Sequence, residues 1–116
     1  MKIERFEEII AWQKAKDLVI FCYDLSEKWR DFSFRDQFRR AAVSIMNNIA
    51  EGFERRGDRE FKHFLFISKG SCGEVRSMSY LADEFKYLDN GQFKLIADKS
   101  TEISKILSGL IKSLDT

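Results

Sequence analysis

Apolar residues recur at three- and four-residue steps between Phe38 and Phe53, and this stretch constrains the fold of the chain more than any other. The residues of the set share one face of a helix with 3.6 residues per turn, and they are Phe38, Ala41, Ala42, Ile45, Ile49 and Phe53. A polar stripe that includes Arg40 and Asn47 runs beside that face. The spacing therefore predicts an amphipathic helix whose apolar side is covered by other elements.

The rest of the chain has the same helical spacing, without a single proline and with only six glycines. We expect helices at about 6–29, from near 36 to 52, from the turn at 55–59 to about 87, and at about 92–114. Residues 30–34 read as a short connection, and Glu60 sits where a capping box would place a carboxylate. The predicted fold is all-α, an up-down-up-down antiparallel four-helix bundle in a single domain over residues 1–116.

Cysteine usage and hydropathy bear on the cellular compartment. Cys22 and Cys72 both lie within helical patterns and form no CxxC pair, so we expect reduced thiols in the core or at an interface. No run of about 18 apolar residues is present, and the first residues lack the apolar segment of a signal peptide. We therefore expect a cytoplasmic protein that does not enter the membrane.

Six of the nine arginines lie between positions 35 and 59, although the net charge of the chain is only +1. Arginine donates paired hydrogen bonds to phosphate and can stack on unpaired bases. These residues are therefore candidate nucleic-acid contacts, with a solvated face held by salt bridges as the alternative. The six are Arg35, Arg39, Arg40, Arg55, Arg56 and Arg59.

Small and polar residues interrupt the second and third predicted helices at positions that would face each other. Two glycines, Gly70 and Gly73, weaken the third helix unless something approaches it closely, so close helix packing is the expected reason. A hydrogen-bonded polar layer that fixes helix register or subunit contacts is favoured over a catalytic carboxylate pair, because no nucleophile or histidine base accompanies the carboxylates. The residues of this layer are Ser44, Asn48, Glu51, Ser71 and Glu74.

Glu60 and His63 match the Glu-x-x-His step that places two metal ligands on one helix face. His63 is the only histidine, so one chain cannot supply the two such motifs that a di-iron bundle needs. The sequence predicts no metal and no cofactor.

Several ordered motifs at fitting spacing resemble the four-helix-bundle proteins encoded within intervening sequences of bacterial 23S rRNA genes. They cover nearly the whole chain and are WQKA at 12–15, DQFRRAAVSI at 36–45, NIAEG at 48–52, and the pairs Glu60-Phe61, Phe64-Leu65 and Gly70-Ser71 with Glu74. Two positions depart from the expected pattern. Met46 stands where the family has a proline, which argues against a kink, and Arg35 stands where a Ser or Thr would cap the helix.

The resemblance implies a homopentamer without enzymatic activity. It also implies kinship with the accessory variability protein of diversity-generating retroelements, which partners a reverse transcriptase and binds nucleic acid. On the matching positions it puts Arg39 and Arg40 forward as nucleic-acid or intersubunit contacts.

Two principal hypotheses follow from the residues and the resemblance. The first is an oligomeric bundle that binds RNA or DNA through arginines repeated around a ring. The second is a scaffold that docks a protein partner without touching nucleic acid itself. A metal-dependent enzyme built on Glu60 and His63 is the third and weakest possibility.

Overall fold

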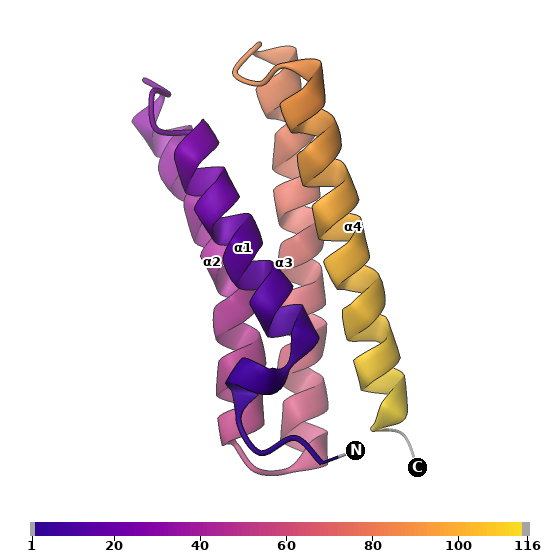
Figure 1. Ribbon diagram of the computed structural model, residues 1–116. Helices are drawn as coiled ribbons and strands as arrows, with labels where there is room; N and C mark the ends of the chain where they lie inside the picture. Colours follow the sequence, from indigo (N-terminus) through magenta and orange to yellow (C-terminus); the bar gives the residue numbers. More distant parts are fainter. Residues whose placement is uncertain (1, 115–116) are drawn as a thin grey trace.

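A computed structural model of the protein describes residues 2–114. A 3-10 turn is followed by four α-helices, which are η1 (Phe6–Glu8), α1 (Ile10–Leu25), α2 (Phe32–Glu54), α3 (Asp58–Glu84) and α4 (Asn90–Ser113). Successive helices run in opposite directions, so α1 begins at the end of the molecule where α4 finishes (Figure 1). The predicted all-α, up-down-up-down antiparallel four-helix bundle is confirmed.

Each helix packs against two neighbours, in the order α1, α2, α3, α4 and back to α1. The bundle measures 45 × 21 × 19 Å. Its core includes Leu18, Phe38, Leu65 and Leu107, one from each helix and all fully buried. No helix within residues 2–114 is both long and apolar enough to cross a membrane.

Helix α1 is shorter at both ends than the predicted 6–29. Residues 6–8 form the 3-10 turn, and Ile9 is extended, so the α-helix starts at Ile10. At the other end the Ser26 hydroxyl donates to the Cys22 carbonyl oxygen over 2.6 Å and satisfies an acceptor of the last turn. The helix therefore ends at Leu25, and Trp29 lies beyond it.

Helix α2 starts at Phe32, four residues before the predicted Asp36, and so the expected connection at 30–34 is partly helical. The Asp31 side chain provides the N-cap, because its Oδ1 accepts a hydrogen bond from the Phe34 amide over 3.1 Å. Arg35 cannot cap the helix, as expected, but Asp31 provides the cap four residues earlier. The helix then runs without interruption past Met46 to Glu54.

The turns at the two ends of α3 each contain a residue in the left-handed conformation. Between α2 and α3 this residue is Arg56, with φ of 63°, while Gly57 is extended. Gly57 has no side chain with which to cap α3, and Glu60 instead lies 3.7 Å from Arg55, so the predicted capping box is wrong. A complete capping box occurs at α4, between Asp89 and Gln92.

An aromatic cluster closes the end of the bundle where α1 meets α2. The Trp29 ring lies 5.7 Å from Phe34, 5.2 Å from Phe38 and 5.4 Å from Tyr87, measured between ring centroids. The Trp29 indole N–H also donates to the Tyr87 carbonyl oxygen over 3.2 Å. The cluster fixes the α1–α2 connection against the α3–α4 connection, and with it the start of α2.

Candidate functional site

The six candidate arginines fall into two groups at different heights of the bundle. One group lies in the first half of α2, and the other surrounds the turn between α2 and α3. Arg39 and Arg55 are 16 positions apart on one helix, a separation of about 24 Å at 1.5 Å per residue. The two groups are therefore separate surfaces and are described in turn.

Arg39 is held in place by the end of α1. Its Nε donates to the Ser26 hydroxyl over 2.8 Å, and its Nη2 donates to the Tyr23 carbonyl oxygen over 3.1 Å. The guanidinium carbon also lies 4.3 Å from the centroid of the Tyr23 ring. Arg39 therefore satisfies one carbonyl group and one hydroxyl at the end of α1, and its planar head is fixed on the surface of the bundle.

Arg40 lies beside Arg39 but is exposed, and it has no hydrogen-bond or ion-pair partner among residues 2–114. Both arginines line a cavity of about 310 Å³ together with Tyr23, Asp36 and Val43. The one carboxylate in this cavity belongs to Asp36, whose Oδ1 lies 3.1 Å from Nη2 and 3.2 Å from Nε of Arg35. Because Arg35 offsets the charge of Asp36, an anion can approach the two guanidinium groups.

Of the arginines around the α2–α3 turn, Arg55 is bound to acidic neighbours. Its Nη2 lies 2.8 Å from Glu51, and its Nη1 lies 3.7 Å from Glu60. The hydrogen bond that Arg55 donates to Glu51 is the main reason that the pKa of Arg55 is raised above its usual value. The guanidinium also covers the ring of Phe64 at 4.9 Å, so Arg55 fits the salt-bridge alternative better than phosphate binding.

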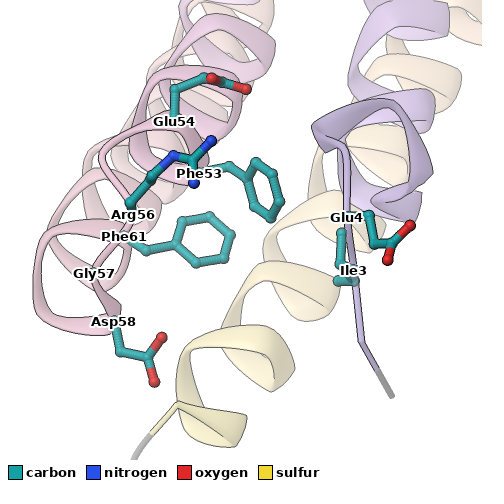
Figure 2. Close-up of a pocket in the computed structure, with 8 residues that line it drawn as sticks. All are labelled: Ile3, Glu4, Phe53, Glu54, Arg56, Gly57, Asp58 and Phe61. Carbon is teal, nitrogen blue, oxygen red and sulfur yellow. The ribbon is translucent and has the colours of Figure 1, made fainter.

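Arg56 and Arg59 are exposed, but Arg56 lies in acidic surroundings. It lines a cavity of about 290 Å³ together with three carboxylates, those of Glu4, Glu54 and Asp58 (Figure 2). Three negative groups around one positive group repel phosphate. The cavity between Arg39 and Arg40 is therefore the better candidate anion site.

The predicted polar layer is assembled from three of its five residues. The hydroxyls of Ser44 in α2 and Ser71 in α3 lie 2.9 Å apart, and the Asn48 side-chain amide donates to Ser44 Oγ over 2.9 Å. Glu51 is outside this cluster because its carboxylate binds Arg55. Glu74 is also outside it, exposed at the edge of a surface cavity that Ser44 lines too.

The close approach of α2 to α3 occurs at a glycine other than those predicted. A Cβ atom on Gly70 or Gly73 would meet nothing within 4 Å, so neither residue is required by packing between the described helices. A Cβ on buried Gly52 would lie 2.6 Å from the Phe64 Cβ and 3.3 Å from the Phe61 carbonyl oxygen. Gly52 therefore lets the two helices come together, and the close packing predicted at Gly70 and Gly73 does not occur between the helices of residues 2–114.

The side chains considered for catalysis or metal binding are dispersed. His63 is exposed and contacts Phe64 edge-on at 5.5 Å, while Glu60 faces Arg55. Both thiols are buried, and burial raises the pKa of Cys22 and of Cys72 to about 12, which keeps them protonated. Within the described chain no three His, Cys, Asp or Glu residues are grouped to hold a metal ion.

The outward side of α3 is an apolar surface that the sequence analysis did not identify. We call it the outer face of α3, and its large side chains are 40% to 62% exposed. Gly70 and Gly73 lie on the same side of the helix, with open space above them. The large residues of this face are Phe66, Ile67, Tyr80, Leu81 and Phe85.

Tyr23 and Asp36 were also missed as members of the cavity beside Arg39 and Arg40. Asp36 appeared in the sequence only as a charge that offsets the arginines. Tyr23 could have been found, because it falls outside the apolar spacing of Leu18 and Cys22 and therefore lies on the surface. An aromatic residue on the surface is a common sign of a binding site.

This arrangement defines a class, a small antiparallel four-helix bundle with an arginine-lined surface cavity and an apolar outer helix face. The chain belongs to the 23S rRNA-intervening sequence protein family, whose model matches residues 7–109. The resemblance seen in the sequence is thereby confirmed.

A solved structure gives the same fold. It is the crystal structure of a protein with unknown function from the S23 ribosomal protein family of Bacteroides thetaiotaomicron, with 24% identity and a TM-score of 0.83. The match covers 89% of the present chain and 99% of the other. None of the curated proteins matches the sequence. Neither description of a related protein names an enzymatic activity.

Proposed function

We propose that the protein is a non-enzymatic, homo-oligomeric bundle that binds RNA or DNA at the cavity between Arg39 and Arg40. The observation that carries this proposal is the exposed guanidinium of Arg40, which has no partner among the described residues, beside the fixed guanidinium of Arg39. Two neighbouring arginines in a concave site suit a phosphate group, because each presents several N–H donors in one plane.

The net charge of +1 means that a single subunit has little general attraction for a polyanion. An oligomer repeats the cavity once per subunit, and affinity then grows with the number of phosphates neutralised across the assembly. Oligomerisation is therefore part of the proposed function.

The test is fluorescence anisotropy with a labelled RNA and a labelled duplex DNA, for the wild type and for Arg40→Gln and Arg59→Gln. Both variants lose one positive charge from an exposed arginine, but only Arg40 lines the proposed site. We expect Arg40→Gln to weaken binding and to reduce the slope of log K against log salt by about 0.7 to 0.9 for each lost phosphate contact. An effect of Arg59→Gln alone would instead place the contacts at the α2–α3 turn.

The outer face of α3 is the proposed subunit interface. Four of its large apolar residues lie on one side of α3 and Phe85 directly follows the helix, and exposed apolar residues gathered on one side are typical of interaction sites. Glycine costs a helix about 1 kcal/mol relative to alanine, and Gly70 and Gly73 have no packing reason within the subunit. A neighbouring subunit that approaches closely would give that reason, and the resemblance suggests five subunits.

The second candidate function is a scaffold on which a different protein occupies the same face. Light scattering separates the two candidates. If the wild type is an oligomer and Phe66→Glu with Leu81→Glu gives a folded monomer, the face joins subunits. If the wild type is itself a monomer and binds no nucleic acid at any salt concentration, the scaffold is favoured.

A further inference from the structure

The cavity beside Arg39 and Arg40 has a flat aromatic component that phosphate binding does not use. The guanidinium of Arg39 is stacked on the Tyr23 ring at 4.3 Å, and Tyr23 remains 42% exposed. Arg39 cannot turn away easily, because Ser26 and the Tyr23 carbonyl oxygen hold it. The guanidinium therefore covers one face of the ring, and the stacked pair presents a rigid flat surface at the wall of a cavity of about 310 Å³.

The other groups of the cavity complement the edge of a heterocyclic base. Val43 adds an apolar wall, and Arg40 supplies a free donor. Both contacts from Arg35 reach Oδ1 of Asp36, and no described residue donates to Oδ2. A carboxylate oxygen in this position can accept a hydrogen bond from the amino group of a base, as aspartate does with cytosine.

From this geometry we propose that the cavity holds one unpaired nucleobase, so that the ligand is single-stranded nucleic acid. The base stacks on the outward face of the Arg39–Tyr23 pair, its amino group donates to Asp36, and Arg40 contacts the adjacent phosphate. This inference rests on the proposed function and narrows the ligand from any RNA or DNA to a single strand. A paired base inside a duplex exposes only its edges, so its face cannot stack on the flat surface of the cavity.

The proposal also gives a base preference. Cytosine has an exocyclic amino group and thymine has a carbonyl oxygen at the same position. With a pyrimidine ring stacked in either case, the Asp36 carboxylate attracts cytosine and repels the thymine oxygen. Oligodeoxycytidine therefore binds more tightly than oligothymidine of equal length, and Asp36→Ala removes the difference.

The experiment compares four labelled DNA probes by fluorescence anisotropy at low salt: oligodeoxycytidine, oligothymidine, an abasic strand of the same length, and a duplex of mixed sequence. The abasic strand keeps every phosphate and lacks every base. We expect it to bind at least about fivefold more weakly than oligodeoxycytidine, since stacking on aromatic side chains contributes that much or more for each base.

Tyr23→Leu keeps an apolar side chain and leaves the backbone contact of Arg39 in place. It lowers the affinity for oligodeoxycytidine to that for the abasic strand and leaves abasic binding unchanged. Phe32→Leu is the matched control, because Phe32 is a 60% exposed aromatic residue of α2 that does not line the cavity. This control binds oligodeoxycytidine as the wild type does.

Equal, salt-dependent binding of the abasic strand, the duplex and oligodeoxycytidine overturns the base pocket and leaves the phosphate site standing. The same conclusion follows if Tyr23→Leu and Phe32→Leu behave alike. Absence of salt-dependent binding to all four DNA probes and to the labelled RNA overturns the proposed function itself, and the base pocket with it.

Discussion

Substitution of Gly52 by alanine tests the packing of α2 against α3. The new Cβ would lie 2.6 Å from the Phe64 Cβ, whereas carbon atoms in contact are separated by about 3.5–4.0 Å. Phe64 Cβ is attached directly to the backbone, so no rotamer change relieves the clash, and the helices must separate by about 1 Å. Overpacking of this kind costs up to about 3 kcal/mol. Alanine returns about 1 kcal/mol of helix propensity, which leaves a net loss of about 2 kcal/mol.

Thermal unfolding followed by circular dichroism measures the effect, at one protein concentration because assembly shifts the midpoint. A loss of about 2 kcal/mol lowers Tm by about 8 °C for a chain of this size. Gly109→Ala is the control, since a Cβ there meets nothing within 4 Å. The free energy of unfolding of this control variant increases by up to about 1 kcal/mol, and its Tm rises. If Gly52→Ala raised Tm as Gly109→Ala does, the account of close packing at Gly52 would be wrong.

Three further predictions concern buried or capping groups. The thiols of Cys22 and Cys72 should react with a thiol reagent only after denaturation, because both are buried and protonated; fast labelling of the folded protein would contradict their placement. Burial raises the pKa of each thiol from 9.0 to about 12. The stability that each buried neutral thiol contributes is therefore complete below pH 9. As the pH rises from 9 toward 12, the free energy of unfolding falls by about 1.4 kcal/mol per pH unit for each thiol. Urea unfolding measured across this range checks the slope. Asp31→Ala should lower the free energy of unfolding by about 1 kcal/mol through loss of the α2 cap, whereas Asp31→Asn keeps the cap. Asp31→Asn should also lower the pKa of Tyr87, which burial and then Asp31 raise, as the phenolate absorbance would report.

The helices of the core were predictable because their apolar residues repeat with the period of a helix. Phe38, Ile45 and Ile49 occupy the centre of the bundle as the spacing indicates. The helix ends were less predictable, since tertiary contacts decide them. Helix α1 ends where the Ser26 hydroxyl and the Arg39 side chain bind the carbonyl oxygens of Cys22 and Tyr23, and Arg39 is 16 positions away from Tyr23 in the sequence.

Some missed features did have a local signal. Asp31 stands three positions before Phe34, the spacing of an N-cap, but the two aromatic residues of this segment were interpreted as a break in the helix. The sequence had no local signal for which glycine contacts a neighbouring helix. Gly52 and Gly70 look alike in an apolar helical pattern, and only the position of the neighbouring helix shows that Gly52 is in contact and Gly70 is open.

The candidate site was predictable only in part, because some of its residues have a signal in the sequence and others do not. Arg39 and Arg40 were identified from their residue type and from the family resemblance. Their different roles follow from the helix period, which turns Arg39 toward α1 and Arg40 toward solvent. Tyr23 joins them only through the packing of α1 on α2, which brings together residues from separate helices.

The location of the nucleic-acid contact is the central claim, and photocrosslinking tests it most directly. A single-stranded RNA that contains the photoreactive base 5-iodocytosine, which keeps the exocyclic amino group, would be bound to the assembled protein and irradiated, and the crosslinked peptides would be identified by mass spectrometry. The account predicts crosslinks at Tyr23 and within residues 36–43, with their loss in Arg40→Gln. Crosslinks confined to the α2–α3 turn or to the outer face of α3 would contradict it.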